Sequence, residues 1–247
     1  MKRFSVILMV VGVALILPFA AVEAAQTHPP PHPNQPAPPL ASARSFDVAV
    51  DVGLPVAGFI PYGKLSGSHG LDGTLSGIGS VSFPYFGLHA RAYPSPSWYI
   101  QMDLLNYSHQ TGTGTWTFKN KDTGNTSKQD MTFVVNRLNV IDFGIGKMLA
   151  TGRVRPNAGF GLGVHYVSFA DEHAHDSAAG WAVGPFGQLG VDITATKIRR
   201  VGDLFFGVNL RLDLIWNWQD YQFDKSNSNL SMVYLPLSFF VSGGLRF

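Results

Sequence analysis

The feature that most constrains this chain is a two-residue alternation of apolar and polar side chains. Every even-numbered residue from Leu204 to Trp218 is apolar, and the residues between them include Asp203, Gly207, Asn209 and Arg211. A period of two places all members of one set on the same face of a β-strand. The run is also longer than the roughly 5 or 6 residues of an ordinary globular strand. The pattern therefore predicts an unusually long strand with one fully apolar face.

The same alternation recurs along the chain. Its phase slips once, near Asn139, which indicates a β-bulge. Together with the run above, eight strand segments are predicted: 46–57, 86–92, 98–104, 133–149, 154–166, 181–193, 204–218 and 233–247.

Composition indicates which face of these strands points inward. Only 14% of the residues are charged, against about a quarter in soluble domains, and the chain holds 27 Gly and 16 Pro. The polar faces are rich in small residues, which fit the narrow lumen of an eight-stranded barrel, while the apolar faces suit lipid. Closure is required because an open sheet edge in hydrocarbon leaves backbone groups unpaired. The chain is therefore predicted to be all-β, an eight-stranded antiparallel transmembrane β-barrel.

The connections between the predicted strands alternate in length. Segments 94–97, 149–152 and 196–202 are short, whereas 61–79, 109–130, 170–180 and 219–229 are long. Outer-membrane barrels have short periplasmic turns and long extracellular loops, and an even strand number returns both termini to the periplasm. Tryptophan and tyrosine near predicted strand ends suit an aromatic girdle: Trp98, Trp116, Tyr166, Trp181, Trp216 and Trp218.

The N-terminal residues predict export. Lys2 and Arg3 precede an apolar run, and Val22-Glu23-Ala24 has small residues where a signal peptidase cleaves. We therefore predict a signal peptide over 1–24, a Pro-rich periplasmic tether over 25–45 and the barrel over 46–247. Because proline lacks a backbone donor, the tether is expected to be extended rather than part of the sheet.

Composition also excludes several classes of function. The absence of cysteine removes disulfides, thiolate metal sites and thiol nucleophiles. A net charge of +2 with scattered basic residues offers no nucleic-acid surface. The Gly-rich run 67–79 lacks the Lys-Ser/Thr of a phosphate-binding loop. No cofactor, no enzyme activity and no nucleic-acid partner is expected.

Two segments resemble a known family. The C-terminal alternation ending in Ser242-Gly243-Gly244-Leu245-Arg246-Phe247 and the strand from Arg155 to Gly163 resemble the OmpW family and related small barrels of Gram-negative outer membranes. This resemblance implies that Phe247 is an assembly signal for the barrel-assembly machinery. It further implies an outer-membrane location, with membrane lipids, lipopolysaccharide and small hydrophobic ligands as partners.

The polar faces carry charges of both signs. Buried charges persist only when they are paired and hydrogen-bonded, so a matched set predicts a braced, largely plugged lumen. The predicted lumen charges are Asp47, Asp51, Arg91, Asp103, Asp142, Lys147, Arg155, Asp192, Arg211, Asp213 and Arg246.

Three functions remain open for such a barrel. The first is a structural or surface-interaction role. The second, implied by the resemblance, is a narrow channel for small hydrophobic compounds, for which Phe186, Ile215, Tyr234 and Phe240 provide an apolar outer lumen. The third is an enzyme acting on lipid A through His165, Ser168 and Glu172, but the alternation places His165 and Ser168 on opposite faces.

One predicted loop has the composition of a metal site. Asp171, His173, His175 and Asp176 lie within six residues, and His-x-His on an extended chain directs both rings the same way. A solvated polar loop explains the same residues equally well, so both interpretations stand.

Overall fold

The computed structural model describes residues 46–66, 71–82, 84–120, 122–172, 175–199, 201–217, 220–224 and 228–247. The predicted signal peptide and tether, together with Trp218 and His173, lie outside these ranges. Among the described residues, no helix is long and apolar enough to cross a membrane.

The described chain consists of antiparallel strands. They are β1 (Phe46–Ser66), β2 (Leu71–Gly79), β3 (Tyr85–Ser95), β4 (Trp98–Asn120), β5 (Thr126–Met148), β6 (Val154–Asp171), β7 (Asp176–Ile198), β8 (Gly202–Asp213), β9 (Ile215–Asn217), β10 (Tyr221–Gln222) and β11 (Asn229–Arg246).

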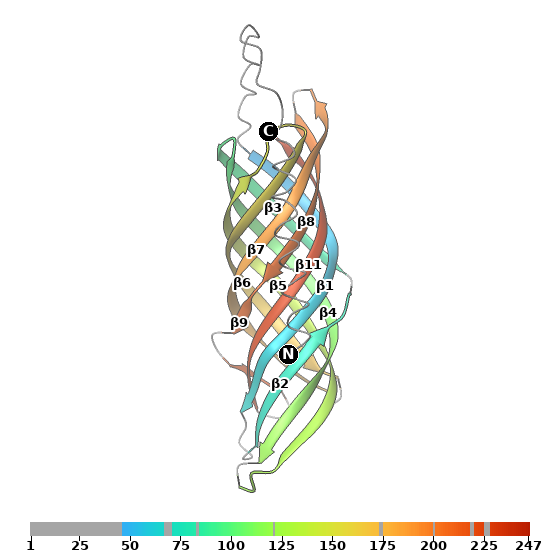
Figure 1. Ribbon diagram of the computed structural model, residues 1–247, viewed down its shortest axis with the longest axis vertical. Helices are drawn as coiled ribbons and strands as arrows, with labels where there is room; N and C mark the ends of the chain where they lie inside the picture. Colours follow the sequence, from blue (N-terminus) through green and yellow to red (C-terminus); the bar gives the residue numbers. More distant parts are fainter. Residues whose placement is uncertain are drawn as a thin grey trace.

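These strands close into a ring of eight. β2 and β3 together form its second strand, β8 and β9 its seventh, and β11 its eighth, which pairs back with β1 from Asp47–Arg246 to Ser66–Asn229. Figure 1 shows the strands winding obliquely around a long axis. The predicted eight-stranded antiparallel barrel is confirmed.

The two ends of the barrel differ. Short connections join β3 to β4, β5 to β6 and β7 to β8 at the end where the chain also finishes, which we call the turn end. The opposite, hairpin end carries the β4–β5 hairpin, which projects beyond the rest in Figure 1.

The connections at the hairpin end are shorter than expected. β1 and β2 occupy most of 61–79, β4 and β5 most of 109–130, and β6 and β7 most of 170–180. The reason is that Gly, Thr and Ser dominate the first two segments, and these residues carry no apolar stripe by which a strand could be recognised. The sheet therefore extends well past the apolar stretches used to predict it.

A phase change in the middle of the barrel confirms the predicted bulge. The β5–β6 register shifts between Asn139 and Ile141. On the neighbouring strand Leu105 has φ of 53°, an uncommon conformation for a leucine, and its side chain is exposed. Asp103, Asn106, Asn139 and Asp142 all consequently point inward, on either side of the bulge.

The barrel wall reverses its polarity along its length. On the turn-end half of β4, Ile100 points outward and is 52% exposed, while Asp103 is buried inside. On the hairpin-end half, Thr113 points outward and Trp116 is buried inside. The turn-end half is thus apolar outside and polar inside, and the hairpin-end half has the polarity of a water-exposed protein.

The apolar exterior of the turn-end half forms a continuous belt. Phe160 and Leu162 are 63% and 66% exposed, which is the expected result of placing large apolar side chains against lipid rather than water. Other exposed belt residues are Val48, Val50, Val52, Leu88, Phe143, Ile145, Phe206, Val208, Phe239 and Val241. The chain is a membrane-spanning barrel of the outer-membrane type.

Candidate functional site: the cross-braced lumen

Arg211 of β8 is the centre of the polar lumen. Its Nη1 donates to Asp103 Oδ2 at 2.6 Å, and its Nη2 donates to Asp213 Oδ1 at 2.8 Å. Nη2 also donates to Asp142. The guanidinium and all three carboxylates are buried, so neighbouring side chains rather than bulk water compensate these charges.

This cluster crosses the barrel. β4 and β8 lie four strands apart in either direction around the ring of eight, so the Arg211–Asp103 pair spans the lumen between opposite walls. The Phe186 ring lies 3.9 Å from the guanidinium and occupies space that side chains at Gly144 and Gly161 would fill. Glycine at these two positions on β5 and β6 is therefore required for the Phe186 ring to pack against the Arg211 guanidinium.

Arg137 of β5 adds to the Arg211 cluster, and we call these residues together the first tier. Its Nη1 donates to Asp213 Oδ2 at 2.7 Å, and its Nε donates to Ser108 Oγ at 3.3 Å. Asp213 is thereby held between two arginines.

A second tier of arginines lies nearer the turn end. Arg91 of β3 donates to Asp192 Oδ2 on β7 at 2.9 Å, again between opposite strands of the ring. Arg246 Nη2 donates to the same Asp192 oxygen at 3.0 Å and to Asp47 at 3.3 Å. The lumen is therefore spanned by arginine at two levels.

Neutral side chains connect the tiers through hydrogen bonds. Asp51 accepts from Ser242 Oγ at 2.6 Å and lies 3.0 Å from His89 Nδ1. A buried chain of donors and acceptors continues from Ser242 to Asp103 through Asn209, Gln188 and Gln101. Gln101 Oε1 also accepts from Arg91 Nε at 3.1 Å, which connects this chain to the second tier.

The predicted lumen charges are mostly brought together by this arrangement. Five of the predicted aspartates each contact an arginine, and Asp51 contacts His89 and Ser242 instead. Those five are Asp47, Asp103, Asp142, Asp192 and Asp213. Arg155 lies at the turn end, half-buried, with its guanidinium 5.2 Å from the Tyr93 ring centroid.

The prediction for Lys147 is wrong. Its side chain is exposed on the outer wall, and its Nζ lies 5.8 Å from the Trp98 ring centroid. Lys147 shares the outward phase of Phe143 and Ile145, whereas Asp142 has the opposite phase. A lysine at the edge of an apolar belt can extend its ammonium group into water, which makes this position favourable.

Among the residues of the lumen ion pairs described above, Arg137 and His89 were not predicted. Arg137 and His89 are both buried in the lumen. His89 could have been found, because it shares the inward phase of Arg91. Arg137 shares its phase with Phe133 and Val135, an apolar set that faces inward rather than toward lipid.

The lumen of the hairpin-end half is filled by apolar side chains. The Phe133 and Phe169 rings stack at 5.8 Å, and Phe169 meets Phe223 edge-on at 6.3 Å. We call this group the apolar plug; its buried members are Ile60, Leu75, Trp116, Met131, Phe133, Val135, Val167, Phe169, Ala178, Ala182, Ile215, Tyr221, Phe223, Leu230, Met232 and Tyr234.

The apolar plug contains one residue predicted for the aromatic girdle and two of the residues predicted for an apolar outer lumen. Trp116 is 3% exposed and belongs to the plug, not to an aromatic girdle, because it lies on the half of β4 where polarity is reversed. Ile215 and Tyr234 are plug members, and Phe186 and Phe240 are also buried. Burial raises the pKa of Tyr221 above its ordinary value, because the charged phenolate is poorly solvated there.

The predicted metal loop is only partly described. Asp171 and Asp176 face each other in register, and Trp116 Nε1 donates to Asp171 at 3.2 Å. His175 is exposed, and His173 lies outside the described residues. Within the part of the chain that the structure describes, no group of three His, Cys, Asp or Glu side chains could hold a metal ion.

The residues considered for lipid A chemistry are separated by the wall. His165 is fully buried in the lumen, while Ser168 lies on the other phase of β6 and Glu172 is exposed. At the turn end, the Phe247 backbone N donates to Phe46 O at 2.8 Å, and the Phe247 side chain is exposed.

Comparison with known proteins gives structural similarities only. No model of a known protein family matches the chain, and no curated protein matches it. The outer membrane protein OprG from Pseudomonas aeruginosa is similar at 14% identity over 83% of this chain and 97% of OprG, with a TM-score of 0.41. Neisserial surface protein A (NspA) is similar at 15% identity over 82% and 97% of the two chains, with a TM-score of 0.36. The outer membrane protease OmpT from Escherichia coli is similar at 4% identity over 83% and 98%, with a TM-score of 0.33.

Proposed function

We propose that this chain is an outer-membrane protein of a Gram-negative bacterium with a structural or surface-interaction role and a lumen closed to solutes. The observation that carries the proposal is the Arg211–Asp103 pair, which spans the lumen between opposite strands. The apolar plug closes the same lumen a second time, toward the hairpin end. We assign the chain no catalytic activity.

The orientation in the membrane follows from the two ends. We place the short turns and both barrel termini in the periplasm and the longer hairpins outside the cell. The hairpin-end wall is polar, with Thr126 and Lys128 exposed, and would present a surface to the medium. Membrane lipids, lipopolysaccharide and, through Phe247, the barrel-assembly machinery are the partners that this placement favours.

Cysteine labelling in intact cells tests location and orientation together. Because the chain contains no cysteine, Asp122→Cys in the β4–β5 turn and Lys197→Cys near the turn end each provide a single thiol. We expect a membrane-impermeant maleimide to label the first and not the second, with both proteins in the outer-membrane fraction. Labelling of Lys197→Cys alone, or a soluble protein, would overturn the proposal.

One observation favours a second candidate, a route for small hydrophobic compounds. The second strand of the ring is interrupted between Gly79 and Tyr85, so the wall there is held by isolated bonds. Ser80 N donates to Thr111 O at 2.8 Å, Ser82 N to Pro55 O at 3.2 Å and Ser82 Oγ to His109 O at 2.8 Å. A gap in a ladder is where a barrel wall opens most easily.

A reversible crosslink separates the two candidates. Ser80 Oγ and Thr111 Oγ1 are 3.5 Å apart, so Ser80→Cys with Thr111→Cys can staple the interruption to β4. If the barrel is closed, cellular uptake of a hydrophobic dye will be the same in the oxidised and reduced states. Uptake that falls on oxidation and returns on reduction would establish the transport function.

A further inference from the structure

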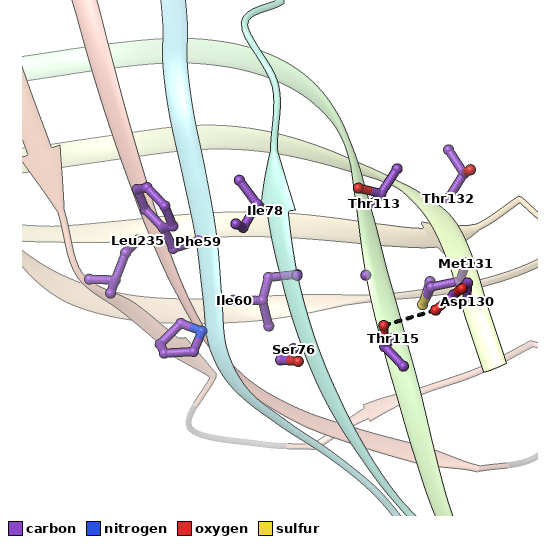
Figure 2. A pocket seen from close by; sticks show the side chains of 13 residues that line it. Phe59, Ile60, Ser76, Ile78, Thr113, Thr115, Asp130, Met131, Thr132 and Leu235 are labelled. Carbon is purple, nitrogen blue, oxygen red and sulfur yellow. Dashed lines mark hydrogen bonds between the residues drawn. The ribbon is translucent and has the colours of Figure 1, made fainter. Parts of the chain in front are cut away.

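A hollow lies on the outer wall of the barrel, over β11, β1, β2, β4 and β5. Its volume is about 740 Å³. Figure 2 shows Leu235, Phe59 and Ile78 on one side of it and Thr113, Thr115 and Asp130 on the other. The outward side chains at its centre, such as Ser76, are short, so the hollow reaches down toward the backbone.

The strand register orders the outward residues into rows across the wall. The row nearest the belt is apolar at one end and runs Leu235–Phe59–Ile78–Thr113–Thr132. The next row, toward the hairpin end, contains Ser76, Thr115 and Asp130. The hollow is therefore apolar at the Leu235 end of its belt-side row, and hydroxyl groups and one carboxylate line much of the rest.

Two lysines lie in the row next to the hollow, on the side away from the belt, although neither lines it. The third row runs Lys64–Thr74–Thr117–Lys128, and both lysines are exposed. Three steps between neighbouring strands separate them, which corresponds to about 14 Å along the row. The one carboxylate that lines the hollow, Asp130, accepts from Thr115 Oγ1 at 3.0 Å.

These features match the parts of a phosphorylated glycolipid. Acyl chains would continue from the lipid-facing belt onto Leu235, Phe59 and Ile78. A sugar headgroup would meet the threonine hydroxyls and Asp130, which can exchange hydrogen bonds with hydroxyl and amide groups. A disaccharide with a phosphate at each end has the length to reach both Lys64 and Lys128, which a single phosphate does not.

We propose that this hollow binds one diphosphorylated, acylated disaccharide lipid of the lipid A type, with a phosphate at each lysine. The site rests on the outer-membrane location proposed above, because this lipid occupies the outer leaflet. Continuity with the belt and charge complementarity in the third row are the two observations behind it.

Binding of purified lipid A to the full chain in uncharged detergent micelles tests the site. We expect Lys64→Gln with Lys128→Gln to weaken binding of diphosphorylated lipid A by about 25-fold, at about fivefold for each lysine. The matched control, Lys147→Gln with Lys197→Gln, removes the same charge near the turn end and is expected to leave binding unchanged. Ser76→Trp fills the hollow without altering charge and is also expected to weaken binding.

The other outcomes identify what would be wrong. Equal losses in the lysine pair and its control would mean general attraction to a basic protein and would overturn the site. Phosphatidylglycerol bound as tightly, with the same lysine dependence, would overturn the glycolipid assignment. Correct surface labelling of Asp122→Cys without any preference for lipid A would reject the site alone, whereas failure of that labelling would reject the proposed function.

Discussion

Arg211 Nη1 on β8 donates to Asp103 Oδ2 on β4 at 2.6 Å, across the full width of the barrel. A wall-to-wall ion pair is possible only because an eight-stranded barrel is just wide enough for side chains to fill. The Arg211–Asp103 pair links opposite walls through the lumen, so the free energy of unfolding of the barrel should depend on this pair.

Arg211→Ala is predicted to destabilise the barrel by about 3–5 kcal/mol, because it leaves three buried aspartates short of a partner. Arg137→Ala should cost less, since Asp213 keeps Arg211. Urea titration of folding into micelles measures both. The exposed Arg153 is the control, and its replacement by alanine should change stability by no more than about 0.5 kcal/mol. Equal losses of unfolding free energy for Arg211→Ala and Arg153→Ala would show that the Arg211 cluster does not stabilise the barrel.

Leu210→Arg is predicted to cost about 2–4 kcal/mol, because Leu210 faces outward in the belt on β8. The same change at Thr126, exposed near the tip of the β4–β5 hairpin, should cost almost nothing. Refolding titrations in lipid vesicles compare the two. The opposite order would mean that the belt is not the lipid-facing surface.

Phe133→Ala is predicted to cost about 3–5 kcal/mol by opening a cavity in the apolar plug. The neighbouring Val134 has the outward phase, and Val134→Ala should cost less than about 1 kcal/mol. Thermal unfolding of the two variants checks this difference. A small effect at Phe133 would indicate that the hairpin-end half contributes little to stability.

The sequence was sufficient to predict the eight strands and most of the lumen charges. Alternation placed Arg211, Asp213 and Asp103 on the polar faces of their strands. The low fraction of charged residues indicated that these polar faces point into the lumen. Lys147 was misplaced although its phase, shared with Ile145, was already visible in the sequence.

Arg137 and Trp116 could not be placed in the same way. Alternation separates two faces but does not state which one is inside, and the wall reverses polarity between the belt and the hairpin end. An apolar residue such as Phe133 therefore looks lipid-facing, although it is fully buried. The hollow on the outer wall was equally invisible, because Lys64 and Lys128 come together only through the register of four strands.

The closed lumen is tested most directly by single-channel recording of the purified wild-type chain in a planar lipid bilayer. Because arginine tiers cross the lumen at two levels and the apolar plug fills it at the hairpin end, the protein should insert without producing any steady ionic current. Regular open-channel steps of uniform size would contradict the closed lumen.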